Sequence, residues 1–138
     1  MATDEPLDKQ LEVVLSEDPR FKAEAYAFVS EAVTQTVRDL RRRESASRHI
    51  SGRELLDGIR ALALKQFGPL ALDVLHEWGV KRTEDFGSIV FNMVKHRLLG
   101  ASDQDSPADF ADVYDFNDAF IKPFVESGPR PANLPKLD

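Results

Sequence analysis

Apolar residues recur with the period of an α-helix along the stretch from Phe21 to Leu40. The members of this stripe are Phe21, Ala25, Phe28, Val29, Ala32, Val33, Val37 and Leu40. Residues at such spacing share one face of a helix, and Glu24 and Glu31 fall outside that face. The pattern recurs at about residues 7–15, 55–67, 70–78 and 86–98. The sequence therefore predicts a mainly α-helical fold of about five helices.

Turn-forming residues separate the predicted helices. Ser51 and Glu54 have the spacing of a capping box, in which both side chains accept hydrogen bonds from backbone amides at the helix start. The Gly-Pro pair at 68–69 predicts a sharp helix end, because glycine tolerates positive φ and proline blocks continuation. Gly58 and Gly87 lie within helices, where glycine costs about 1 kcal/mol relative to alanine. We expect both to be buried at close helix contacts that offset this cost.

Length and composition predict one compact folded domain. A chain of 138 residues lies within the usual size of a single domain, and 42% hydrophobic residues, with 9% aromatic ones, can form a core. We place this helical domain at residues 1–125. Residues 126–138 are rich in proline and poor in core material, so we expect them to form a mobile tail.

The C-terminal third combines aspartates with aromatic residues. It is too aromatic for a disordered tail, so we expect it to pack back against the helices. Residues 98–99 and 111–113 can pair as a small two-stranded ribbon, or Pro107 can begin another helix. We favour the ribbon, which would give the domain a winged-helix-like end.

The balance of charge limits the classes of partner. Eighteen Lys and Arg residues against 24 Asp and Glu residues give a formal net charge of −6, the wrong sign for a protein that coats nucleic acid or an anionic membrane. No stretch is long and apolar enough to span a membrane, and the first ten residues lack an apolar signal core. We expect a cytoplasmic protein that does not bind membranes. The lack of cysteine excludes disulfides, thiolate zinc sites and a cysteine nucleophile.

The sequence contains no clear catalytic or metal-binding motif. His49, His76 and His96 lie in different predicted elements, without the spacing of paired zinc ligands. Asp103 and Asp105 lack the further ligands and the glycine of a calcium-binding loop. Neither a Gly-x-Ser-x-Gly turn nor a glycine-rich phosphate loop occurs. We predict a protein that is not an enzyme and needs no metal or cofactor; a hydrolase or lyase that uses His49 with nearby carboxylates is the enzymatic alternative.

Positive charge concentrates between residues 38 and 60. The guanidinium group of arginine suits phosphate because it donates hydrogen bonds in a fixed fork, and the helix start at Ser51 offers free backbone amides. An anion or nucleic-acid site here would use Arg41, Arg42, Arg43, Arg48, His49, Ser51 and Arg53. Two other interpretations stay open. Ser51 caps its own helix while Arg48 is solvated, or the cluster from Arg41 to Arg53 pairs with the acidic segment of the same molecule.

The leading functional hypothesis is a non-enzymatic protein-interaction module, because charge is divided between an arginine-rich region and an acidic aromatic segment. Exposed side chains of Tyr114, Phe116 and Phe120 would form the apolar centre of an interface with another protein or with a second copy of this chain. The alternative is a phosphate- or nucleic-acid-binding protein of helix-turn-helix type that uses the arginine-rich region 38–53.

Several motifs occur together in this chain: a His-x-Ser-Gly helix start, a Phe-Gly-Pro stop, a Trp-Gly turn and a Glu-Asp-Phe-Gly helix opening. They lie in the stretches RHISGRELLDGIRALALKQFG, LALDVLHEWGVKRTEDFGSIVFNMV and DSPADFADVYDF. Over about residues 18–120, the chain resembles a family of small bacterial conserved hypothetical proteins of unknown function, found mainly in planctomycetes and verrucomicrobia. The resemblance implies a self-contained bacterial domain, and it implies no activity, cofactor or catalytic residue.

Overall fold

Every regular element in the described part of the computed structural model, which comprises residues 7–44, 49–100 and 105–125, is helical. The elements are α1 (Leu7–Glu17), α2 (Ala23–Glu44), α3 (Gly52–Phe67), η1 (Gly68–Leu70), α4 (Ala71–Glu77), α5 (Thr83–Lys95), η2 (Pro107–Phe110), α6 (Phe116–Phe120) and α7 (Lys122–Val125), of which η1 and η2 are 3₁₀ turns. The prediction of a mainly helical fold is confirmed. The predicted tail, residues 126–138, lies outside the described residues.

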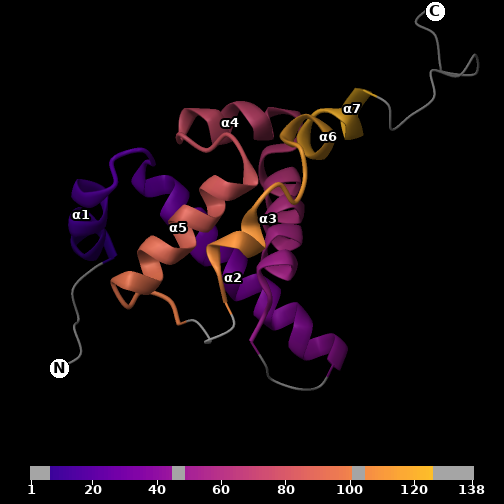
Figure 1. The fold of residues 1–138 in the computed structure, drawn as a ribbon. Helices are drawn as coiled ribbons and strands as arrows, with labels where there is room; N and C mark the ends of the chain where they lie inside the picture. The colour runs from indigo at the N-terminus through magenta and orange to yellow at the C-terminus, as the bar shows by residue number, and fades with distance from the viewer. Residues whose placement is uncertain (1–6, 45–48, 101–104, 126–138) are drawn as a thin grey trace, which may run out of the picture.

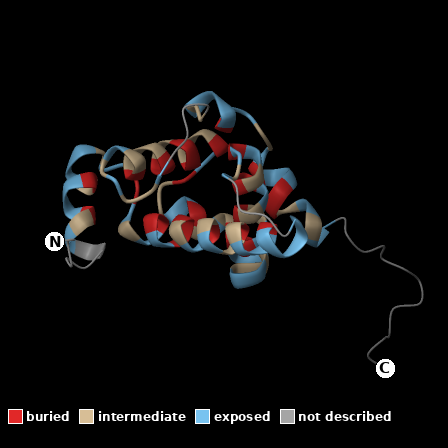
Figure 2. Ribbon diagram, turned by 90° about the horizontal axis from the view of Figure 1, so that it is seen from below, coloured by how far each residue is buried: buried red, intermediate tan, exposed pale blue. Residues whose placement is uncertain are grey.

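The three longest helices, α2, α3 and α5, contact one another, and the shorter elements pack around them (Figure 1). Near one end of α3 lie α4 and α6, whereas the last turns of α2 lie at the opposite end of the molecule. Buried residues line the inward sides of the helices (Figure 2). The stripe predicted for α2 is largely core: Phe28, Val29 and Leu40 are buried, although Val33 and Val37 remain half-buried.

Two helical glycines allow close packing. A Cβ atom added at Gly58 on α3 would overlap with Oγ1 of Thr36 on α2. One added at Gly87 on α5 would lie 2.8 Å from Cβ of Phe110, the residue with which η2 fills the core. The predicted close contacts are therefore confirmed at both positions. The predicted burial is confirmed for Gly87 only, since Gly58 is half-exposed.

The two-stranded ribbon predicted for the C-terminal third is wrong. The backbone turns after α5 at Arg97, whose φ is 63°, and residues 98–99 are not in a strand. The chain instead takes the alternative start at Pro107, where Ser106 and Asp109 form a capping box for η2. Short polar side chains that hydrogen-bond to nearby backbone amides compete with strand pairing. Here Ser106 and Asp109 stabilise a 3₁₀ turn in place of a strand. Without the ribbon, the comparison with a winged helix loses its structural basis.

The expectation that the aromatic residues after η2 are exposed is also wrong. Phe116 is 6% exposed and Phe120 is fully buried. Their ring centroids lie 5.1 Å apart, edge to face. Tyr114 is half-buried, and its hydroxyl donates a hydrogen bond of 2.8 Å to the carbonyl oxygen of Leu56 on α3. Burial of apolar surface stabilises the fold, so Phe116 and Phe120 form core instead of the exposed centre of an interface, and Tyr114 packs against this core.

Candidate functional site

Buried and half-buried apolar side chains surround one hollow between α2, α5 and the start of α3. The hollow has a volume of about 460 Å³. Its apolar lining consists of Val33, Val37, Ile50, Leu55, Val90, Phe91, Val94 and Leu99. His49, Ser51 and Asp105 are the polar side chains on its border. Its size and predominantly apolar lining are those of a binding cavity.

A second hollow, of about 570 Å³, continues from the first along α2. The two hollows share Val33 and Val37, and the second is also lined by Thr34, Arg38, Arg41 and Arg42. We call the two hollows together the α2 groove. An apolar floor thus leads directly to three exposed guanidinium groups.

Sequence reasoning missed this groove, although its signal is present in the sequence. Val33, Val37 and Arg41 are spaced i, i+4, i+8, which places them on one face of a helix, as does the spacing of Arg38 and Arg42. The periodicity of the apolar stripe predicts the helix face, but it does not show that Val33 and Val37 remain partly accessible beside arginines. The last turns of α2, which lie at the end of the molecule away from α4 (Figure 1), leave part of that stripe accessible.

The structure divides the predicted anion site. Arg41 and Arg42 line the groove, whereas the exposed Arg43 and Arg53 lie outside both hollows. Arg48 lies outside the described residues. His49 and Ser51 border the first hollow. Of the predicted residues, the structure thus brings Arg41 and Arg42 together in one hollow and places His49 and Ser51 at the border of the adjoining one.

The interpretation in which Ser51 caps its own helix is confirmed. Oγ of Ser51 accepts a hydrogen bond of 3.0 Å from the amide of Glu54. The Glu54 carboxylate in turn accepts one of 2.7 Å from the amide of Ser51. A negative charge from the protein itself thus already occupies the positive end of α3.

Several aspartates of the C-terminal third form local contacts instead of pairing with the arginines. Asp115 caps α6 by accepting a hydrogen bond of 2.8 Å from the amide of Asn117. Asp118 forms an ion pair of 3.0 Å with Lys122, one turn further on. Asp109 caps η2. These three aspartates shape the backbone of the segment.

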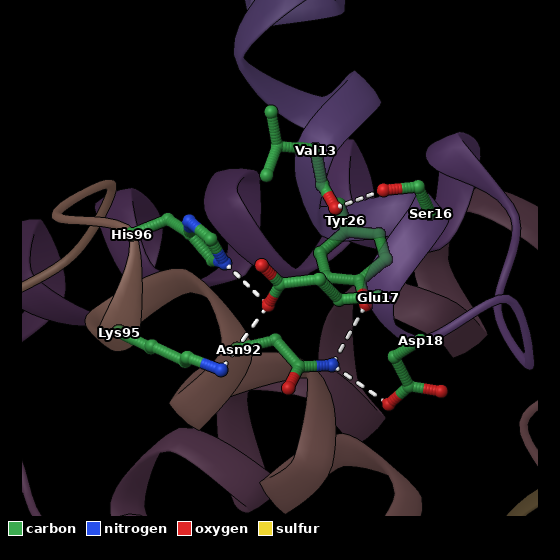
Figure 3. A network of polar contacts seen from close by, with 8 residues as sticks. All are labelled: Val13, Ser16, Glu17, Asp18, Tyr26, Asn92, Lys95 and His96. Carbon is green, nitrogen blue, oxygen red and sulfur yellow. Dashed lines mark hydrogen bonds and ion pairs between the residues drawn. The ribbon is translucent and has the colours of Figure 1, made fainter.

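A cluster of polar side chains connects the end of α1 to the end of α5 (Figure 3). The Glu17 carboxylate lies 3.0 Å from Nε2 of His96 and accepts a hydrogen bond of 3.1 Å from Nζ of Lys95. These two contacts lower the pKa of Glu17, and the contact with His96 has the larger effect. The cluster is solvated, and Glu17, Lys95 and His96 line neither of the two hollows, so we interpret it as a cross-link between helices.

Asp18, next in the chain, forms a second connection to α5. Its carboxylate accepts 2.8 Å hydrogen bonds from both Nε and Nη2 of Arg20, and one of 2.9 Å from Nδ2 of Asn92. The same amide nitrogen lies 3.0 Å from the hydroxyl of the buried Tyr26 (Figure 3). Hydrogen bonds from Arg20 above all hold the pKa of Asp18 well below its usual range. This network fixes the turn between α1 and α2.

Within the described ranges, no three His, Asp or Glu side chains come together as a metal site. In the same part of the chain, no helix combines the length and apolar character needed to cross a membrane. Comparison of this chain with protein-family models, with curated proteins and with solved structures finds no match.

Proposed function

We propose that this protein is a non-catalytic interaction module and that it binds a segment of a partner protein in the α2 groove. The observation that carries this proposal is the continuous surface from half-buried Val33 and Val37 to Arg38, Arg41 and Arg42. Protein interfaces combine an apolar centre with polar and charged groups at the rim, and arginine is enriched in them.

The polar groups near the groove support binding more than catalysis. The Ser51 hydroxyl accepts a backbone hydrogen bond at the start of α3, and Glu54 is used in the same cap. Both side chains therefore stabilise the helix that forms one wall of the groove. The remaining lining is mostly aliphatic, which suits the burial of apolar side chains of a ligand.

A photocrosslinking experiment tests the proposal. A photoreactive amino acid at Val94 on α5, inside the groove, is irradiated in a nuclease-treated native extract. The same amino acid at Val13, which is 51% exposed on α1, serves as the control. We expect a protein crosslink at position 94 that is absent at position 13 and is lost when Val37→Glu puts a charge on the groove floor.

Two outcomes would contradict the proposal. Equal crosslinks at both positions would indicate non-specific contact. A crosslink to RNA or DNA in extract without nuclease, with none to protein after nuclease, would favour the phosphate- or nucleic-acid-binding alternative, in which Arg41 and Arg42 contact the backbone.

A further inference from the structure

The α2 groove also indicates what kind of segment it binds. We propose that the partner segment is an amphipathic α-helix of about three turns with acidic side chains at one end. This inference rests on the proposed function, because it specifies the occupant of the same groove. Length, backbone chemistry and charge each support it.

The length of the groove fits a short helix. From Val33 to Arg42, α2 advances about 14 Å at a rise of 1.5 Å per residue. A bound helix of about eleven residues has a similar length and turns an apolar side chain toward the same side at i, i+3 or i+4, and i+7. The groove floor offers Val33, Val37, Phe91 and Val94 to those side chains.

The hydrogen-bonding needs of the ligand's backbone favour a bound helix over a bound extended strand. A bound strand obtains much of its affinity by hydrogen-bonding to the edge of a sheet. The side chains of the groove floor come from α2 and α5, whose backbone groups bond within each helix. A helical ligand satisfies its own amides and carbonyls, so it can dock on an apolar floor at a smaller desolvation cost.

Charge complementarity predicts acidic side chains at one end of the bound helix. Arg38, Arg41 and Arg42 are exposed at one end of the groove, in a chain whose net charge is −6. Carboxylates suit these guanidinium groups, since each can accept two parallel hydrogen bonds. Single-stranded nucleic acid would instead require several aromatic side chains for base stacking, and Phe91 is the one aromatic residue that lines the two hollows.

Selection from a display library of random fifteen-residue peptides tests the inference. Peptides are selected on the full-length protein and depleted on the Val37→Glu variant. We expect the selected sequences to repeat apolar residues with a helical period, to place Asp or Glu one turn beyond the last of them, and to contain few Lys or Arg residues. Selected sequences without a helical period, or without acidic enrichment, would overturn the inference.

Two double charge-reversal variants then test the contact itself. Binding of the most enriched peptide to each variant is measured by fluorescence anisotropy. Arg38→Glu with Arg42→Glu changes the groove, whereas Arg43→Glu with Arg53→Glu changes net charge equally outside both hollows. We expect the first pair to weaken binding at least about tenfold and the second to have an effect several times smaller. Replacing the acids of the peptide by lysine should restore binding to the first pair.

Equal losses in the two double variants would overturn the assigned contact, because they would reflect net charge alone. Failure of the inference can be told apart from failure of the proposed function. If position 94 crosslinks to a partner protein but the mapped segment is neither helical nor acidic, the helix is wrong and the interaction module stands. If neither crosslinking nor selection yields a ligand sensitive to Val37→Glu, both are wrong.

Discussion

Replacement of Gly58 by alanine sets two effects of opposite sign against each other. Alanine in a helix interior is more favourable than glycine by about 1 kcal/mol, so helix propensity alone predicts stabilisation. The added methyl group, however, would overlap with Oγ1 of Thr36 across the contact between α2 and α3. Overpacking of this kind costs about 1–3 kcal/mol. We therefore expect Gly58→Ala to lower the free energy of unfolding by up to about 2 kcal/mol.

The partner residue allows a double-mutant cycle. Oγ1 of Thr36 is buried, and no hydrogen-bond partner is found for it among the described residues. Removal of an unsatisfied buried hydroxyl offsets the loss of a methyl contact worth about 0.8 kcal/mol, so Thr36→Ala should be close to neutral. In the double variant, the two Cβ atoms at positions 36 and 58 would lie 3.3 Å apart, which needs only a small shift. We expect it to be at least as stable as the wild type.

Urea unfolding followed by circular dichroism measures all four proteins of the cycle. The reasoning predicts a favourable coupling of about 2 kcal/mol between the two substitutions, and shifts of several degrees in the melting temperature for Gly58→Ala. A Gly58→Ala protein more stable than the wild type would refute it, because helix propensity would then outweigh the contact. Additive effects of the two substitutions would refute it as well.

Four further substitutions test the folding of the domain. Gly79 has a φ of 91°, and a Cβ there would overlap with the carbonyl oxygen of Arg20, so Gly79→Ala should cost about 1–3 kcal/mol by urea titration. Phe120→Ala should cost about 3–5 kcal/mol, and Tyr114→Phe about 1 kcal/mol through its lost hydrogen bond; losses below about 1 kcal/mol for Phe120→Ala would contradict its place in the core. The hydrogen bonds that lower the pKa of Asp18 stabilise the fold above about pH 4, where its carboxylate is ionised in both the folded and the unfolded state. This contribution to stability is lost as the pH falls further. Asp18→Asn should therefore show a smaller loss of stability between pH 5 and pH 2 than the wild type, as measured by urea midpoints.

The helices could be predicted from the sequence because their signals are local. The apolar stripe of α2 and the capping box of α3 each lie within one element, and their outcome depends little on the rest of the chain. The predicted stop at residues 68–69 is likewise observed, since α3 ends at Phe67 and Gly68 has a φ of 53°. Local preference and tertiary structure agree at these positions.

The C-terminal third could not be predicted in the same way, because its structure depends on distant residues. Phe110 packs into a notch that Gly52 and Gly87 leave open on α3 and α5. The amide of Val113 donates a hydrogen bond of 3.1 Å to the hydroxyl of Thr83 at the start of α5. No short window of sequence contains both partners of such contacts. The packing and capping contacts of this segment therefore outweigh the preference of residues 98–99 and 111–113 for strand pairing.

The α2 groove lies along a helix that is much longer than α5, which packs against it. At 1.5 Å per residue, the 22 residues of α2 span about 33 Å, whereas the 13 residues of α5 span about 20 Å. The apolar stripe of α2 is covered unevenly: Phe28, Val29 and Leu40 are core, whereas Val37 stays half-buried. Periodicity identifies a helix face but does not show whether the protein itself or a partner covers that face. For this reason we expect Val37→Glu to disturb binding far more than folding.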